Sequence, residues 1–168
     1  MKNLLFALFM FALPLAGNAQ TPQKFGYFSY QTALASMPDY AIATRKLADL
    51  KLKYEEEMRR VEEEFNKKFE QFLEGQRDFA PSILRKRQAE LKDLIEKNLA
   101  FKEESNRLLK QAETEIYAPL KKKLADAIRG IGDARGFMFI VNTDNETLPY
   151  VNGTAGEDIN ALLKESLQ

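Results

Sequence analysis

The sequence contains no histidine, no cysteine and no tryptophan. Without histidine it lacks the side chain that most often acts as a general base near neutral pH. Without cysteine it lacks thiol nucleophiles, disulfide bonds and the ligands of most transition-metal sites. Its carboxylates fall in short runs such as residues 55–57 and 62–64, which are typical of a solvated helix face. An enzyme is therefore the least favoured class, and we expect no cofactor and no metal.

An excess of charge of one sign is also missing. The chain has 25 basic and 25 acidic residues, and without residues 1–19, which contain Lys2, it has 24 basic and 25 acidic ones. Nucleic-acid binding requires clustered positive charge that displaces counterions from phosphates. We therefore expect no nucleic acid among the partners.

Long apolar runs are absent except at the start, where residues 4–15 are apolar after Lys2. This run is too short to span a bilayer and has the layout of a secretion signal. The small residues just before Gln20 predict a signal peptide over residues 1–19, cleaved after Ala19. A lipid-anchored lipoprotein would need a cysteine after its signal, so we expect an exported, soluble protein. The periplasm of a two-membrane bacterium is the favoured location.

Two charged amphipathic stretches dominate the rest of the chain. In the first, apolar residues recur with spacings of 3, 4, 4, 3, 4, 4 and 3 at Leu47, Leu50, Tyr54, Met58, Val61, Phe65, Phe69 and Phe72. This eleven-residue repeat averages about 3.67 residues per turn and predicts a nearly straight helix. Residues 75–81 contain Gly75 and Pro81 and predict a turn, so residues 39–118 are expected to form a helical hairpin with its tip at 75–81.

The second stretch predicts a helix that returns along the first and continues to residue 134. Its expected inner stripe comprises Leu84, Leu91, Leu94, Ile95, Leu99, Leu109, Ala112, Ile116, Leu120, Leu124, Ile128 and Ile131. If the chain reverses near Asp78, residue n of the first helix lies level with about residue 156 − n of the second. Pro119 removes one helical hydrogen bond, and we expect a kink, an interruption or a hinge there.

The remaining segments predict a small body made of residues 20–38 and 119–168. Strands are expected at residues 24–29, 136–142 and 148–152, with a short helix at 31–37. A capping box at Thr154 and Glu157 predicts a terminal helix over residues 157–167. The fold class is therefore α+β, mainly α, with a long antiparallel hairpin on a β-rich body. Such a meagre core favours oligomerisation, for which the candidate residues are Phe25, Tyr27, Phe137, Phe139 and Val141.

In this order, the segments resemble the Skp/OmpH-like periplasmic chaperones of outer-membrane proteins. The likeness covers nearly the whole chain after the signal, and its motifs are residues 24–27, 36–40, 116–120, 136–141, 148–151 and 158–159. The resemblance implies a homotrimer in which the strands join in one body and three hairpins surround a cavity. It further implies an ATP-independent holdase that binds unfolded outer-membrane proteins and prevents their aggregation. The best-known members are strongly basic, whereas this chain is near neutral.

Several side chains of the arm are candidates for contact with an unfolded client, namely Met58, Phe65, Phe69, Phe72, Phe79 and Phe101. Methionine and aromatic side chains adapt to many sequences, but the same residues could instead hold the two helices together. A basic cluster at the tip, Arg77, Arg85, Lys86 and Arg87, could touch phospholipid or client carboxylates, or could simply be solvated. Any membrane contact is expected to be peripheral. The alternative function is a non-enzymatic coiled-coil scaffold of the envelope that binds one folded partner.

Overall fold

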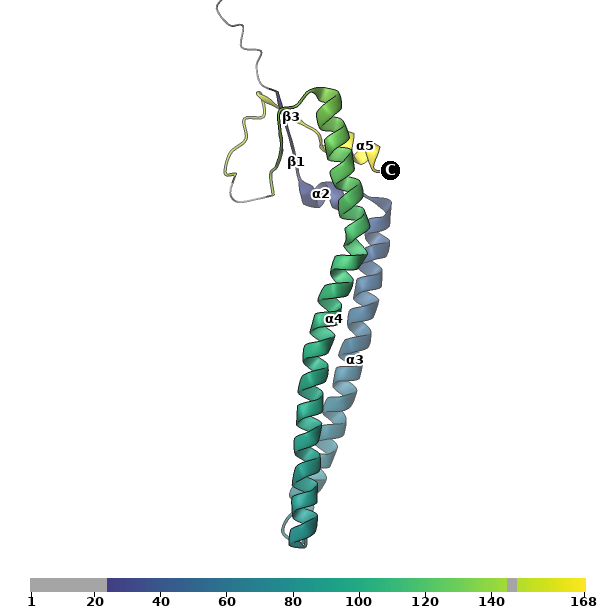
Figure 1. Ribbon diagram of the computed structural model, residues 1–168, viewed down its shortest axis with the longest axis vertical. Coiled ribbons are helices and arrows are strands. Elements are labelled where there is room, and N and C mark those ends of the chain that lie inside the picture. Colours follow the sequence, from purple (N-terminus) through teal and green to yellow (C-terminus); the bar gives the residue numbers. More distant parts are fainter. Residues whose placement is uncertain (1–23, 145–147) are drawn as a thin grey trace, which may run out of the picture.

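The computed structural model describes residues 24–144 and 148–168 of the chain, so the expected signal peptide lies outside the described residues. The elements follow in the order β1 (Phe25–Phe28), α2 (Tyr30–Ala35), α3 (Pro38–Gly75), α4 (Pro81–Arg135), β2 (Ile140–Asn142), β3 (Gly156–Asp158) and α5 (Asn160–Ser166). Helices α3 and α4 form a long antiparallel hairpin that projects from a small body (Figure 1). The mainly helical α+β fold expected from the sequence is confirmed.

Contacts between aromatic rings fix how the two helices of the arm are aligned. The rings of Tyr40 and Tyr117 lie 5.8 Å apart near the body, and those of Tyr54 and Phe101 lie 6.3 Å apart further out. Both pairs agree with the expected alignment, in which residue n of α3 lies level with about residue 156 − n of α4. A hydrogen bond from the Asn98 side-chain amide to the carbonyl oxygen of Val61, 3.2 Å long, also joins the two helices.

The ends of the two long helices follow from local chemistry. Pro38 and Pro81 occupy the first turns of α3 and α4, where a missing N–H costs no helical hydrogen bond. Helix α3 ends at Gly75, and the ring of Phe79 lies where a side chain on that glycine would be. Helix α4 ends at Arg135 and is capped by Gly136, whose positive φ of 65° allows its N–H to bond the carbonyl of Asp133.

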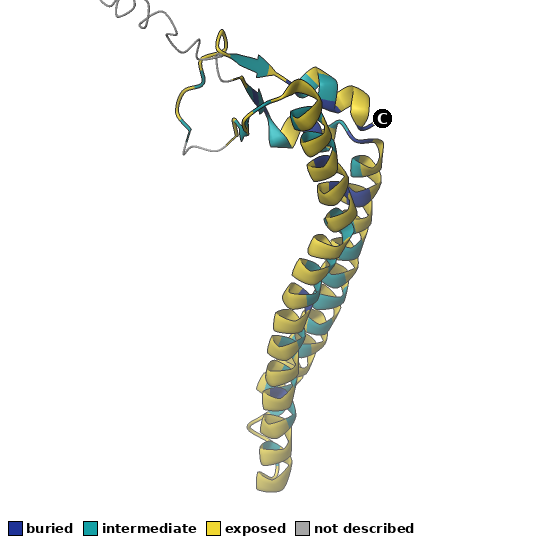
Figure 2. Ribbon diagram, turned by 45° about the horizontal axis from the view of Figure 1, so that its top comes forward, coloured by how far each residue is buried: buried dark blue, intermediate teal, exposed yellow. Residues whose placement is uncertain are grey.

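Of the alternatives expected at Pro119, the interruption is wrong, because α4 runs as one helix from Pro81 to Arg135. Pro119 is exposed, so the helical hydrogen bond that it removes faces solvent rather than the interior. Leu120 and Leu124, directly after it, are buried in the body and hold the next turns in place. Packing therefore compensates for the lost bond. Figure 2 shows buried positions concentrated where the arm joins the body and exposed positions along the arm.

The body contains a parallel sheet with strand order β2-β1-β3. Two of the expected strands differ from the observed ones. Residues 148–152 form no strand, and Tyr150 is 76% exposed; the third strand is instead β3, which pairs Gly156 with Phe25. Glycine permits this pairing because the Phe25 ring occupies the space of a side chain at position 156. The strand expected over residues 136–142 begins only at Ile140. Gly136 and Phe137 cap α4, whereas the N–H of Met138 donates to the carbonyl of Lys24 and the carbonyl of Phe139 accepts from the N–H of Gly26.

The capping box expected at Thr154 and Glu157 is also wrong. Helix α5 begins at Asn160, and Glu157 lies in β3, with its carboxylate 3.3 Å from the Arg135 guanidinium. The Thr154 hydroxyl donates to the side-chain oxygen of Asn152 instead of capping a helix. Pairing with β1 therefore overrides the local helix signal.

A small apolar core anchors the arm to the body. Its fully buried side chains are Leu124 of α4 and Ile159, Leu163 and Leu167 at the end of the chain. Phe28, Ala33 and Met37 extend this core towards the start of α3. In the described part of the chain, no helix is both long enough and apolar enough to cross a membrane.

Candidate functional site

The arm has two broad faces, each containing side chains of both helices. A groove of about 400 Å³ on the first face is lined by Leu47, Lys51, Asn106, Leu109, Lys110 and Glu113. Two grooves mark the second face. The lining of the groove near the tip includes Lys68, Gln71, Arg87 and Glu90. The lining of the groove near the body includes Asp39, Lys46, Glu115 and Pro119. Successive residues of a helix are rotated by about 100° around its axis. The positions of these lining residues therefore show on which face each of the remaining residues of α3 and α4 lies.

The first face is apolar in the outer half of the arm. Four large apolar side chains of this face are exposed: Phe69 (41%), Leu73 (47%), Ile95 (45%) and Leu99 (57%). Phe65 is half-buried and stacks on Phe69, with 5.8 Å between the ring centroids. We call Leu99, Ile95, Phe65, Phe69 and Leu73 the apolar ladder.

The ladder crosses the face diagonally from α4 to α3. Leu99 lies level with residue 57 of α3 and Ile95 with residue 61, so successive members are one helical turn, about 6 Å, apart along the arm. Residues four apart are also rotated by about 40° relative to each other around the helix axis. Because of this rotation Leu99 lies on the outer side of α4 and Ile95 lies nearer to the seam. Beyond the seam, Phe65, Phe69 and Leu73 continue it to the outer side of α3.

The second face is polar and contains a network of ion pairs. The Arg60 guanidinium donates two hydrogen bonds, of 2.9 and 2.7 Å, to the carboxylate of Glu57. Arg60 also lies 3.7 Å from Glu64, which in turn lies 3.3 Å from Lys68. The hydrogen bonds from Arg60 lower the pKa of Glu57 below its ordinary value. Apart from Ile83 near the tip and Ile42 near the base, the described part of this face exposes no large apolar side chain.

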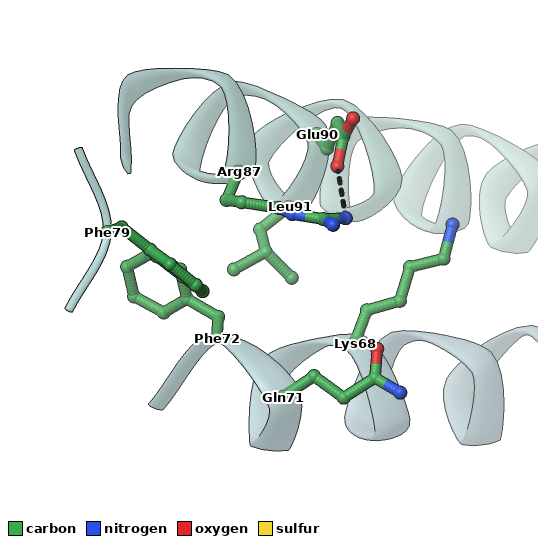
Figure 3. Close-up of a pocket in the computed structure, with 7 residues that line it drawn as sticks. All are labelled: Lys68, Gln71, Phe72, Phe79, Arg87, Glu90 and Leu91. Atoms are coloured by element: carbon green, nitrogen blue, oxygen red, sulfur yellow. Dashed lines mark hydrogen bonds and ion pairs between the residues drawn. The ribbon is translucent and has the colours of Figure 1, made fainter. Parts of the chain in front are cut away.

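The predicted client-contact residues divide between the ladder and the seam. Phe65 and Phe69 belong to the ladder, whereas Met58 is half-buried in the seam. Phe101 packs against Tyr54, and Phe72 packs against Phe79, whose ring centroid is 6.4 Å away. Phe72, Phe79 and Leu91 point towards one another and close the tip (Figure 3). The side chains of Phe72, Phe79 and Phe101 therefore bind α3 to α4, and Phe69 is the one predicted client-contact residue in the described chain that is exposed.

The basic cluster of the tip is partly neutralised. Arg87 and Lys86 lie 3.2 and 3.7 Å from carboxylate oxygens of Glu90, and Figure 3 shows the pair formed by Arg87. Arg77 and Arg85 are exposed and make no ion pair with the described residues. The neutralising acid is Glu90, which lies one helical turn after Lys86.

Sequence reasoning missed three members of the ladder. Ile95 and Leu99 were assigned to the inner stripe of the second helix, and Leu73 was assigned to neither face. A second apolar row at four-residue spacing, offset from the stripe that contains Leu91 and Leu94, is the signal that could have identified Ile95 and Leu99. The seam between the helices is filled instead by Phe101 and by buried Ser105, whose hydroxyl donates to the carbonyl of Phe101.

The body presents a second apolar surface. Tyr27 pairs with Val141 in the sheet, so their side chains share the face opposite buried Phe28. On that open face, Phe25 stacks on Phe139 with 5.5 Å between the ring centroids, and Phe139 is 52% exposed. Phe137 is the exception among the predicted body residues, because its ring approaches Gly26 on the core side.

The described residues contain no group of three or more side chains suited to hold a metal ion. No buried side-chain polar atom in this part of the chain lacks a hydrogen-bond partner. Two exposed apolar surfaces of the described chain are the ladder on the arm and the open sheet face on the body.

Fold and surfaces together define a class of protein in which a helical-hairpin arm projects from a small strand-containing body. The family described as "Outer membrane protein (OmpH-like)" matches residues 24–167. The chain therefore belongs to the OmpH-like family. A crystal structure of a candidate OmpH-like outer membrane chaperone from Caulobacter crescentus CB15 is similar, with a TM-score of 0.69 and 13% sequence identity. The alignment covers 89% of this chain and 86% of that one. The comparison with curated proteins found no match.

Proposed function

We propose that this protein is a periplasmic holdase that binds unfolded outer-membrane proteins without ATP and prevents their aggregation. The observation that carries the proposal is the apolar ladder on a long, otherwise charged arm. Membership of the OmpH-like family supports the same function, and so does the fold shared with a candidate outer membrane chaperone.

The ladder suits a client that has no fixed shape. Its side chains are leucine, isoleucine and phenylalanine, which make non-directional contacts roughly proportional to the apolar area that they cover. Because each of its exposed members already contacts the arm on one side, each contributes only part of a full burial to a complex. Affinity would then arise from many weak contacts, as expected for a protein that accepts several sequences.

We further propose that three copies assemble through the open sheet face and the edges of β2 and β3. The sheet has β2 and β3 as its edge strands, and both have backbone groups available for pairing. The open face includes Phe25, Tyr27, Phe139 and Val141, which would be covered in such an assembly. Three arms around a cavity would place several ladders near one client.

The test of assembly is the mass in solution. We expect a trimer at micromolar concentration, and Phe139→Asp should lower the mass because it puts a charge into the proposed interface. Helix content measured by circular dichroism is the control, since Phe139 lies outside the protomer core. A monomeric parent protein would contradict the proposed assembly.

The test of function is suppression of aggregation. A denatured outer-membrane barrel is diluted into buffer with the protein at several-fold excess of trimer, without nucleotide, and light scattering is followed. We expect scattering to be suppressed. Unchanged scattering would refute the holdase. Recovery of a single folded partner from envelope extract, in place of a mixture of barrel proteins, would favour the scaffold.

A further inference from the structure

We infer that the apolar ladder recognises extended segments in which every second residue is apolar, that is, amphipathic β-strands, in preference to apolar segments with helical spacing. This inference rests on the proposed function and specifies the class of client segment that the arm binds. The width and the charged borders of the ladder carry it, and the spacing of the ladder is compatible with it.

The spacing of the ladder is close to that of alternate residues in a strand. Its members are about 6 Å apart along the arm, because each follows the last by one turn. Because the ladder also shifts sideways from α4 to α3, the distance between successive members is longer than this axial spacing. In an extended strand, side chains on one face recur about every 6.8 Å. A strand laid diagonally across the face can therefore place successive inward side chains on Leu99, Ile95, Phe65, Phe69 and Leu73.

The width of the ladder favours a strand over a helix. The ladder is a single file of side chains, and exposed polar residues border it on both helices. Strands occupy about 4.8 Å laterally, whereas a helix with its side chains is about 10 Å wide and buries a stripe of more than one row. A helix placed here would lie over charged groups, which a strand avoids.

Charges on the two borders suit the polar positions of such a strand. Glu62 of α3 and Lys92 of α4 are exposed, and their helical phase places them on opposite borders of the ladder where it crosses the seam. Glu62 makes no ion pair with the described residues, and Lys92 lies 3.7 Å from Glu96 at an exposed position. One acidic and one basic side chain on opposite borders complement a segment whose polar residues carry both signs. A segment with charges of only one sign would meet one unfavourable border.

Two labelled peptides of equal composition test the inference with the full protein. Each has about nine residues, enough for five inward side chains at strand spacing. In the first peptide, leucine and phenylalanine alternate with serine and threonine; in the second, the same residues are rearranged to helical spacing. We expect fluorescence anisotropy to show at least about tenfold tighter binding of the alternating peptide, equivalent to about 1.4 kcal/mol.

Two variants locate the site of binding. Phe69→Gln removes the ladder member between Phe65 and Leu73, whereas Leu52→Gln alters a side chain that is 54% exposed on the back of α3. The first variant should weaken binding of the alternating peptide by about fivefold, or about 1 kcal/mol, and the second should leave it unchanged. Both variants should retain the parent helix content.

Equal binding of the two peptides, tighter binding of the helically spaced one, or an equal effect of the two variants would overturn the inference. Suppression of barrel aggregation is measured in parallel. If suppression persists while the alternating peptide shows no advantage, the inference fails and the proposed function stands. If suppression is absent although the alternating peptide binds more tightly, the proposed function fails and the surface is a strand-binding site of another kind.

Discussion

Replacing Ile95 and Leu99 with glutamine should weaken client binding without unfolding the arm. The two side chains are 45% and 57% exposed, so a client can cover about half of each. Full burial of such a side chain contributes about 1.5–3 kcal/mol, and half of this is about 1 kcal/mol per residue. The double variant should therefore lose about 2 kcal/mol of binding free energy, equivalent to an affinity about thirtyfold lower.

The stability of the arm should change little in the same variant. Glutamine and leucine have similar helix propensities, and substitutions at exposed sites usually change the free energy of unfolding by less than about 0.5 kcal/mol. Thermal unfolding followed by circular dichroism measures this change. Affinity is measured by titrating a labelled, unfolded barrel protein with the parent protein or the variant.

A matched control is available in the double variant Leu52→Gln and Ile83→Gln. These side chains are 54% and 47% exposed, similar to the ladder pair, but they lie off the first face of the arm. The control should bind the client like the parent protein. Equal losses in the ladder pair and the control pair would refute the reasoning, because affinity would then follow exposed apolar area wherever it lies.

Three further predictions concern the fold that presents the ladder. Leu163→Ala should reduce the free energy of unfolding by about 2–5 kcal/mol, measured in urea, because this fully buried side chain lies at the joint between arm and body; an unchanged midpoint would contradict that role. Gly75→Ala should displace the Phe79 ring, which lies 2.5 Å from the position of the added carbon, and should speed proteolysis at the tip relative to the parent protein. Lowering the pH should make the arm less stable, because hydrogen bonds from Arg60 depress the pKa of Glu57 in the folded protein. The stabilisation is present above the ordinary glutamate pKa of about 4.5 and is lost as the pH falls through the lower pKa of the folded state. Helix content that is equally resistant to urea on both sides of this range would be inconsistent with the last prediction.

The sequence was sufficient to predict the arm because helical periodicity is a local property. The eleven-residue repeat beginning at Leu47, the breakers Gly75 and Pro81 and the alignment of the two helices are all visible in the spacing of residue types. The ring contacts of Tyr40 with Tyr117 and of Tyr54 with Phe101 agree with that alignment.

The body was predicted less well because its strands depend on partners far away in the sequence. Residues 148–152 have a strand-like composition, but β1 pairs with residues 156–158, where Gly156 accommodates the Phe25 ring. Thr154 and Glu157 have the spacing of a helix cap, yet the pairing of Glu157 with Gly26 places it in a strand. Sheet pairing is decided by contacts across the fold, which local pattern does not encode.

By itself, the sequence determined that this protein has a charged, amphipathic hairpin, a small body and no histidine or cysteine for catalysis. It also supplied the apolar residues of the ladder, but not their exposure. Only the tertiary structure decided that Ile95 and Leu99 face solvent while Phe101 and Ser105 fill the seam. The physical reason is that the partner helix covers a limited arc of each helix. Which apolar row is buried depends on how the two helices are rotated against each other.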